Sequence, residues 1–494
     1  MKRNLLLCAA LTGMLSCGEQ NKTGEGTEMP TSMGSSNSIL PVDSQVVFCL
    51  SMISNLPASA YVNYGKHDSD SCSNYIISYT VPIMDSTLMY ATDNTGGQDL
   101  KLSDWKRVWG PAVTIRRSDM IKGNPYVASA SYTIFQQQGT DNYVVGIEAT
   151  NEYSYYDWRT LDFNVATTNK WTEICPDAGE TSGVLSHGTY LGLNTLINLN
   201  SVLDEQKSGV AFLDNIIADA KNNNKQVNIV VTGHSLGGAL SPVFALYMQD
   251  HVETANATAN ANVYCMSTAG ATPGDDAFAA YYNSKLLKNS VRVWNFLDVV
   301  PRGWDRDLMT AIKDGQGGGG LYSASGSSVA FDSIYICKCA KDTHMRNTIP
   351  FTPIETPFTI KAAVDGAMVT AGLSGVTYQY ICNRGTSFMG AGSNGTLYVN
   401  IDASKQKWMS KLIKYLDGKS VDFLSQLGAQ HVSAYILHYN MKQIHEYMHE
   451  MVTRSEHSVV NHACDNKELI IPELTEEEKK VFALKLMHVG AWGW

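Results

Sequence analysis

The stretch 231–241, VTGHSLGGALS, places Ser235 between two glycines, Gly233 and Gly237. The apolar run VNIVV at 227–231 predicts a short buried strand that ends where this stretch begins. The apolar spacing of LGGALSPVFALYMQDH, which follows Ser235, predicts a helix. A serine at such a junction lies in a sharp turn where most side chains would clash, and the two glycines remove those clashes. This is the G-x-S-x-G pattern of a nucleophile elbow, which needs a base and an acid from elsewhere in the chain.

The sequence on both sides of this junction alternates between strand and helix patterns. Two strand-like runs lie within 126–150, separated by the turn QQGTD, and 207–221 carries the apolar face of a helix. Beyond the junction, 261–268 and 290–297 are candidate buried strands, with DDAFAAYYNSKLL as a helix between them. This alternation implies right-handed crossovers, and we predict an α/β fold with a mostly parallel sheet and helices on both faces.

The rest of the chain is less regular. Residues 73–80, SNYIISYT, have a strand-like pattern within a mixed segment. Further on the alternation stops, and we expect 305–425 to be an irregular insertion packed on the sheet. Residues 432–452 have the spacing of one long helix, and a capping box that begins at Thr475 starts a final helix.

The N-terminus, MKRNLLLCAALTGMLSCGEQ, joins two basic residues to an apolar run too short for a spanning helix, and predicts a secretory signal peptide over 1–16. Its end, MLSC, resembles the lipobox of bacterial lipoproteins, although Met14 stands where leucine is usual. The resemblance implies that Cys17 is lipidated and that 17–38 is a flexible tether. The protein would then be exported and anchored to a bacterial membrane, the outer membrane in particular, facing the periplasm or the surface. The alternative is an ordinary signal with an incidental cysteine.

Composition limits the possible functions and partners. The 494 residues can bury a large core, and a net charge of −10 without a strongly basic stretch argues against a nucleic-acid partner. Of the ten cysteines, eight remain once Cys8 and Cys17 are set aside. Export permits disulfides among them, but the sequence does not give their connectivity. The CKC run at 337–339 is a weak metal motif, and we expect no metal site there.

The elbow serine needs partners, because a serine hydroxyl requires a base to take its proton and the base requires an acid to fix its tautomer. In hydrolases with such an elbow these follow in the order serine, acid, histidine. Asp298 directly follows the strand pattern VRVWNF, at the expected carboxyl edge of the sheet, although a strand-end aspartate is also a common turn residue. Two candidate bases follow it: His344, in KDTHMRN, and His431, in GAQHVSAYILHY.

Five segments in order resemble those of class 3 lipases, the fungal-type triacylglycerol lipase family. They are VVGIEATNEYSYYDWRTLDF, VLSHGTYLGL, VTGHSLGGAL, STAGATPGDDAFAAYYN and VRVWNFLDVVPR, and the resemblance covers about 125–305 plus a short piece near 431. It implies an α/β-hydrolase domain over 39–445 that includes the insertion, and leaves 446–494 as a C-terminal helical extension.

The resemblance also implies a role for each matched residue. Ser235 corresponds to the nucleophile and Asp298 to the acid of the triad. The family's histidine comes late in the domain, shortly before a tyrosine, which favours His431 over His344.

An oxyanion hole follows from the same resemblance. The backbone N–H of Thr150 would join that of Leu236 in holding the developing oxyanion. Here the sequence departs from the family pattern, because Glu148-Ala149 stands before Thr150 where the family usually has Arg-Gly. The shape of this turn is therefore an open question at the level of sequence.

A different motif lies at 445–449, where His445, Glu446 and His449 spell H-E-x-x-H. On a helix the two histidines share one face and could bind zinc, with Glu446 as the general base of a metalloprotease. The extension that supplies a third histidine is absent. We therefore expect the solvated face of a long helix and no metal.

The resemblance implies a serine esterase that cleaves acylglycerol-type lipids through an acyl-enzyme intermediate and needs no cofactor. Its partners would be a lipid or other ester substrate and the membrane that holds the tether. A phospholipase or another esterase on the same fold is an alternative, as is a surface lipoprotein that uses a degenerate hydrolase fold for binding. Head group, acyl chain length and oligomeric state do not follow from the motifs.

Overall fold

A computed structural model of the chain describes residues 39–62, 69–90, 100–118, 125–151, 154, 156–205, 207–295, 298–313, 360–382, 386–388, 428–454 and 460–462. The predicted signal peptide and tether, Cys17, His344 and the capping box at Thr475 lie outside these residues, as does most of the 305–425 insertion. Within the described ranges, no helix has both the length and the apolar character that a bilayer span requires.

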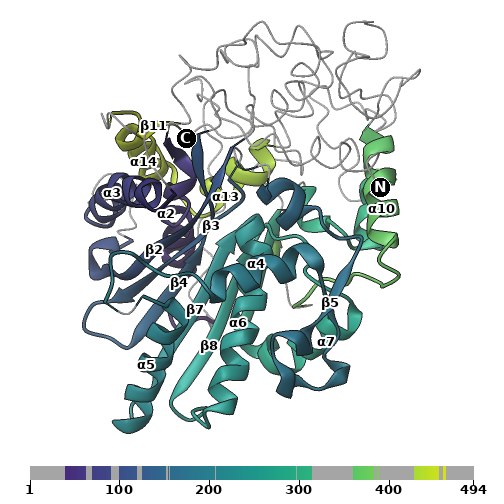
Figure 1. Cartoon of the computed structure of the whole chain (residues 1–494), viewed down its shortest axis with the longest axis horizontal. Helices are drawn as coiled ribbons and strands as arrows, with labels where there is room; N and C mark the ends of the chain where they lie inside the picture. The colour runs from purple at the N-terminus through teal and green to yellow at the C-terminus, as the bar shows by residue number, and fades with distance from the viewer. Residues whose placement is uncertain are drawn as a thin grey trace, which may run out of the picture.

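The described strands form one nine-stranded sheet with an added two-stranded ribbon, β5–β6 (Thr168–Lys170, Val184–Ser186). Its parallel part is the row β4 (Asn142–Ile147), β7 (Val227–His234), β8 (Ala261–Thr268), β9 (Ser290–Asn295) and β10 (Thr386–Phe388). The antiparallel part extends from β4 through β3 (Tyr126–Gln137), β1 (Ala60–Val62) and β11 (Val460–His462), and β2 (Trp105–Arg117) pairs with β3. The predicted α/β architecture is confirmed (Figure 1).

Helices cover both faces of the sheet. The apolar core on one face includes residues of α4 (His187–Ile197), α5 (Gly209–Asn222), α6 (Leu236–Thr254) and α7 (Asp276–Leu286). The core on the other face includes residues of α2 (Ser44–Ile53), α3 (Ser69–Leu88), α13 (Ala434–His438) and α14 (Lys442–Arg454). Neighbouring strand residues alternate between the two cores, so the central strands are buried on both sides and have continuous apolar sequences.

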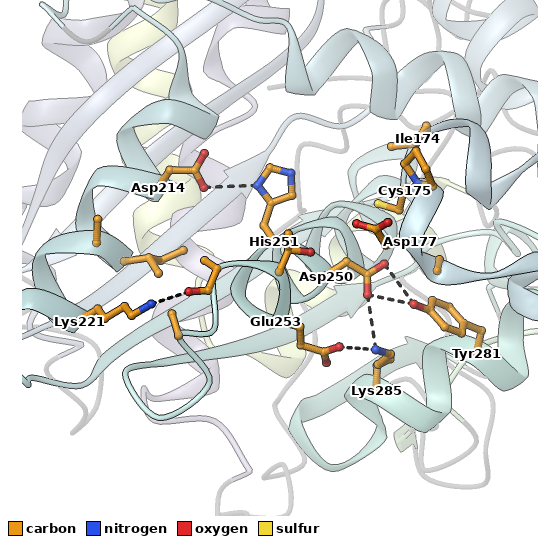
Figure 2. Close-up of a pocket in the computed structure, with 17 residues that line it drawn as sticks. Ile174, Cys175, Asp177, Asp214, Lys221, Asp250, His251, Glu253, Tyr281 and Lys285 are labelled. Carbon is orange, nitrogen blue, oxygen red and sulfur yellow. Dashed lines mark hydrogen bonds and ion pairs between the residues drawn. The ribbon is translucent and has the colours of Figure 1, made fainter.

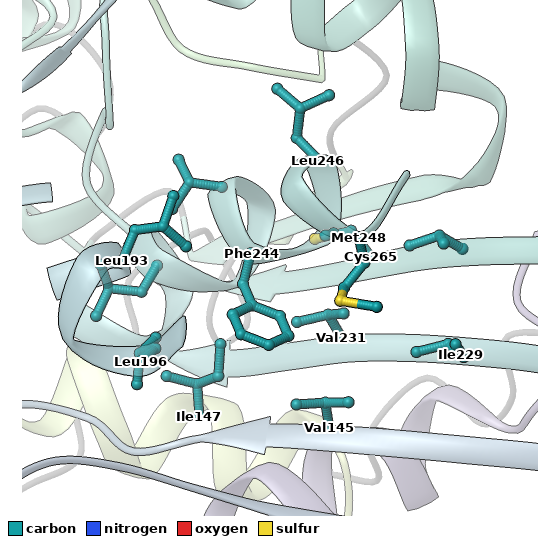
Figure 3. Close-up of a cluster of buried hydrophobic side chains, with 14 of the residues drawn as sticks. Val145, Ile147, Leu193, Leu196, Ile229, Val231, Phe244, Leu246, Met248 and Cys265 are labelled. Carbon is teal, nitrogen blue, oxygen red and sulfur yellow. The ribbon is translucent and has the colours of Figure 1, made fainter. Parts of the chain in front are cut away.

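The ring of Phe244 on α6 lies at the centre of the first core. Figure 3 shows it among Leu196, Ile147 and Val231, which come from α4, β4 and β7. Phe244 is fully buried. This contact fixes α6, and with it the residue that precedes the helix, against the strands at the centre of the sheet.

Two expectations about secondary structure are wrong. The run at 73–80 belongs to the 20-residue helix α3, in which Cys72, Ile76, Tyr79 and Ile83 are buried at spacings of three and four residues. A run of eight residues is short enough to fit the pattern of either a strand or a helix, and here the packing of the segment on the sheet selects the helix.

The predicted long helix at 432–452 is divided. It consists of α13 and α14, which are separated at Asn440, where φ is +52°. A π-helical turn, η11 (Ala429–Ser433), precedes α13. The break lets the chain change direction, so that one piece approaches the end of β9 while the other packs along α3.

Three of the cysteines lie buried as free thiols: Cys49, Cys175 and Cys265. Burial raises the pKa of the Cys265 thiol to about 12, which keeps it protonated at neutral pH. These three side chains act as small apolar groups in the core and form no disulfide.

Replacing Phe244 with alanine tests the importance of the core beneath α6. Removing a fully buried ring at this position should lower the free energy of unfolding by about 3–5 kcal/mol. Met89→Ala, at a side chain that is 69% exposed, is the control and should change it by no more than about 0.5 kcal/mol. Equal values in chemical denaturation would contradict the packing described above.

Candidate active site

Ser235 occupies the turn between β7 and α6, as the G-x-S-x-G pattern predicts. Its φ is +58° and ψ is −119°, a strained conformation for a residue with a side chain. A Cβ atom on Gly233 would lie 2.3 Å from the carbonyl carbon of Gly237, so glycine is required for the turn to close. The serine is 6% exposed.

Asp298 and His431 lie in direct contact beside this turn. His431 Nδ1 and Asp298 Oδ2 are 2.7 Å apart, and both side chains are fully buried. Among the described residues, His431 Nε2 has no hydrogen-bond partner. The His431 ring lies 4.9 Å from the ring of His234, the residue before Ser235. An aspartate at Nδ1 selects the tautomer that leaves Nε2 free to accept a proton.

The segment that carries His431 is fixed to the end of β9. The side chain of Asn295 donates to both the backbone and side-chain oxygens of Gln430, at 2.9 and 2.8 Å. The Tyr435 hydroxyl accepts from the Asn295 amide at 2.8 Å and donates to Asp298 at 3.1 Å. Burial and the neighbouring carboxylate raise the pKa of Tyr435 well above its usual value, so this hydroxyl remains a donor.

Thr150 lies at the end of β4 in a turn that packs against the start of α6. Its hydroxyl donates to Asp162 Oδ2 at 3.0 Å, at the end of the π-helical turn η3 (Asp157–Asp162). A Cβ atom on Gly237 would lie 2.4 Å from the carbonyl oxygen of Ile147. The glycine therefore lets the turn approach the helix that begins with Leu236.

The amides of Thr150 and Leu236 are both without an acceptor among the described residues. Leu236 is the first residue of α6, where a backbone N–H has no partner within the helix. Free backbone amides at a helix start attract negative charge. The turn therefore offers two donors near Ser235, as an oxyanion hole requires.

Buried carboxyl groups surround the base of this turn. Glu148 is 1% exposed, and no hydrogen-bond partner of its carboxyl oxygens lies within the part of the chain that the structure describes. Burial, followed by the charge of Asp157, raises the pKa of Glu148 well above its usual value. Burial also raises the pKa of Asp157 to about 6 and that of Asp162 well above its usual value. The raised pKa values of Glu148 and Asp162 favour their neutral forms, which reduces the negative charge near the turn.

The H-E-x-x-H residues lie on α14, away from this cluster. His445 and His449 are partly buried and Glu446 is exposed, so the expectation of a solvated face is wrong for the two histidines. Burial, followed by the charge of His449, lowers the pKa of His445 to about 4. Among the residues that the structure describes, no three side chains are grouped to hold a metal ion.

A separate cavity of about 550 Å³ lies at the other end of α6, lined by α5, α7 and the turn at 174–178 (Figure 2). Ser235 directly precedes α6, and Asp250 lies fifteen residues further on in that helix. The cavity is therefore about 22 Å from Ser235 along the helix. Several charged side chains of the cavity pair with one another, as Lys285 does with Asp250 and Glu253.

Three residues of the site were not identified from sequence: Asn55, Asp162 and Tyr435. Tyr435 and Asp162 lie in segments that already carried the resemblance, so their positions after His431 and Trp158 were the available signal. Asn55 had no such signal, because it lies in an irregular segment and acts through a tertiary contact.

Glu148→Gln tests the protonation of the buried carboxyl group. The folded pKa lies above the unfolded one, so the folded state binds more protons and the wild type loses stability as the pH rises above about 4. The variant lacks this titration. The difference in the free energy of unfolding, variant minus wild type, should therefore increase between pH 4 and pH 8 in urea denaturation. A difference that stays constant with pH would mean that Glu148 has an ordinary pKa.

Part of the chain is similar in sequence to a known protein family. Residues 183–305 match the family model of lipase (class 3). This segment includes Ser235, Leu236 and Asp298 and ends before His431. No curated protein matches the chain in sequence.

Solved structures are similar to the chain over longer ranges. M37 lipase has 21% sequence identity and a TM-score of 0.55, and the alignment covers 83% of this chain and 98% of that one. Lip2 lipase from Yarrowia lipolytica has 13% identity and a TM-score of 0.30, with 53% and 75% covered. Lipase II from Rhizopus niveus has 13% identity and a TM-score of 0.29, with 51% and 78% covered. The chain therefore has an α/β-hydrolase fold, and its segment 183–305 is similar to the class 3 lipase family.

Proposed function

We propose that the protein is a carboxylic ester hydrolase that uses Ser235, His431 and Asp298 as its catalytic triad. The observation that carries the proposal is the buried hydrogen bond from His431 to Asp298 beside the nucleophile elbow. The match to the class 3 lipase family supports the reaction class.

The reaction would proceed by acyl transfer. His431 Nε2 takes the proton of the Ser235 hydroxyl as the oxygen attacks the ester carbonyl, and Asp298 stabilises the imidazolium that forms. The carbonyl oxygen becomes an oxyanion held by the amides of Thr150 and Leu236. His431 then gives its proton to the leaving alcohol, which leaves an acyl-enzyme. Water, activated by the same imidazole, attacks the acyl-enzyme and releases the fatty acid.

Acylglycerol-type lipids are the substrates we propose, on the basis of the family match. Phospholipids and other esters are the second candidates, because the same triad serves all of them. A panel of esters that differ in acyl chain length and head group separates these classes. The highest kcat/KM on tri- or diacylglycerols supports our proposal, and preference for a phospholipid would move the protein to the second class.

Ser235→Ala tests the assignment of the nucleophile. It should lower kcat for a short-chain nitrophenyl ester by about 10⁴-fold or more. Ser241→Ala is a matched control in α6, since that hydroxyl is buried and makes no hydrogen bond to any described residue, and it should keep wild-type activity. A fluorophosphonate should label the wild type at Ser235. A chain that folds but neither hydrolyses esters nor labels would instead be a binding protein on a degenerate hydrolase fold.

We further propose that Cys17 is lipidated and anchors the protein to the outer membrane of a bacterium. The MLSC sequence supports this. Cells fed a labelled fatty acid should transfer the label to the wild type, and the protein should partition into detergent. Cys17→Ser should lose both properties without losing esterase activity. Equal partitioning of the two proteins would contradict the anchor.

A further inference from the structure

The turn at 148–151 presents four successive backbone amides, and only one of them lacks an acceptor among the described residues. The other three donate to oxygen atoms from three different segments: Glu148 N to Ser131 O at 2.9 Å, Ala149 N to Asn55 Oδ1 at 2.9 Å and Asn151 N to Asp157 Oδ2 at 3.0 Å. The remaining amide is that of Thr150, the proposed oxyanion donor. The three acceptors therefore define which amide is free.

Asn55 differs from the other two acceptors in its origin. It follows α2, about 70 residues before the start of the segments that resemble class 3 lipases, and precedes the short helix η1 (Leu56–Ser59). Its side chain is 1% exposed, and among the described residues its other hydrogen bond is from Nδ2 to the sulfur of Met52, at 3.7 Å. The side-chain oxygen of Asn55 thus accepts its hydrogen bond directly from the turn, at the Ala149 amide.

The position of Asn55 is fixed by close packing. A Cβ atom on Gly146 would lie 2.1 Å from Ser54 Oγ, so the end of α2 is pressed against β4 four residues before Thr150. Ser54 Oγ itself donates back to Leu50 O at 2.9 Å within the helix. The backbone that carries Asn55 therefore has little freedom to move.

The turn is held from both faces of the sheet. α6 touches it from one side through Gly237, where a Cβ atom would lie 2.8 Å from Glu148 O. α2 belongs to the core on the opposite side, and Asn55 reaches the turn from there. Two fixed contacts, one on each side, set the direction of the peptide between them.

We propose that Asn55 is a positioning residue for the oxyanion hole: its side-chain oxygen holds the Ala149 amide and so keeps the Thr150 amide directed at the reacting carbonyl. This inference rests on the proposed ester hydrolase function.

The expected effect is on kcat. Without Asn55 Oδ1 the Ala149 N–H is buried without an acceptor, and the turn relaxes toward another one. Because an oxyanion donor acts through its fixed orientation, a rotated Thr150 amide weakens binding of the transition state more than binding of the substrate. A loss of one donor lowers kcat by about 10²–10³-fold, and a misdirected donor should cost about 10–100-fold.

The experiment measures kcat and KM for a soluble ester with the full chain and three variants. Asn55→Leu keeps the volume of the side chain and removes the acceptor, so kcat should fall about 10–100-fold while KM changes little. Asn55→Ala repeats the comparison with a smaller side chain. Thr87→Ala is the control, because it removes a buried hydrogen bond within α3, from Thr87 Oγ1 to Ile83 O, and leaves both contacts of the turn intact. It should keep the wild-type kcat even where the melting temperature falls.

Asn55→Asp supplies a readout that a purely structural role would not move. Its carboxyl group offers an oxygen at the same place, so it should recover most of the kcat that Asn55→Leu loses. Above the pKa of the new carboxyl group the added negative charge disfavours the oxyanion. The ratio of its kcat to that of the wild type should therefore fall as the pH rises, while the ratio for Asn55→Leu stays flat.

The outcomes separate this inference from the proposed function. Activity that disappears in Ser235→Ala but is as high in folded Asn55→Leu as in Thr87→Ala overturns the positioning role and leaves the esterase function supported. An Asn55→Asp variant as slow as Asn55→Leu at every pH also overturns it. Should Asn55→Leu fail to fold, the comparison of Asn55→Ala and Asn55→Asp with Thr87→Ala tests the same point. A wild-type protein without esterase activity would contradict the proposed function itself.

Discussion

The hydrogen bond between His431 and Asp298 joins two turns that are 133 residues apart in the sequence. A buried carboxylate is costly unless its oxygens are satisfied, and Asp298 accepts from the Val300 amide and the Tyr435 hydroxyl as well as from the imidazole. This satisfied carboxylate in turn fixes the imidazole, whose second nitrogen has no partner in the described ranges. The chemistry proposed for Ser235 depends on that nitrogen being available and correctly oriented.

The N-terminal helix α2 supports both halves of the site. Phe48 stacks on Tyr439 with ring centroids 4.4 Å apart, and its ring meets that of His234 edge-on at 6.0 Å. Seven residues later, Asn55 binds the turn that precedes Thr150. The helix α2 and the segment that directly follows it therefore contact both the histidine segment and the oxyanion turn, which are far away in sequence. Because α2 packs in the second core, the stability of that core and the geometry of the site are coupled.

Local sequence patterns were sufficient to predict the strands at the centre of the sheet, but not the tertiary contacts that complete the site. The strands β7, β8 and β9 are long apolar runs, and Gly233 and Gly237 restrict the turn at Ser235 to one geometry, so sequence alone predicts them. The contact of His431 with Asp298 depends on how a distant segment returns to the sheet, which no local pattern records. For the same reason the sequence could not identify Asn55, whose role is a single hydrogen bond across the fold.

Motif spacing alone was not enough to assign a metal site on α14. Two histidines four residues apart face the same side of any helix, so the spacing of His445 and His449 carries no information about a metal without a third ligand. The described residues offer none. By contrast, the serine motif gained its meaning from the tertiary partners that surround it.

The most direct measurement is a crystal structure of the full chain after reaction with a phosphonate ester, which mimics the tetrahedral intermediate. The phosphorus should be bonded to Ser235 Oγ, with its oxygen about 2.7–3.1 Å from the backbone nitrogens of both Thr150 and Leu236 and with His431 Nε2 facing Oγ. A phosphonyl oxygen that points to solvent, or an imidazole turned away from the serine, would contradict the convergence of these residues on one reacting centre.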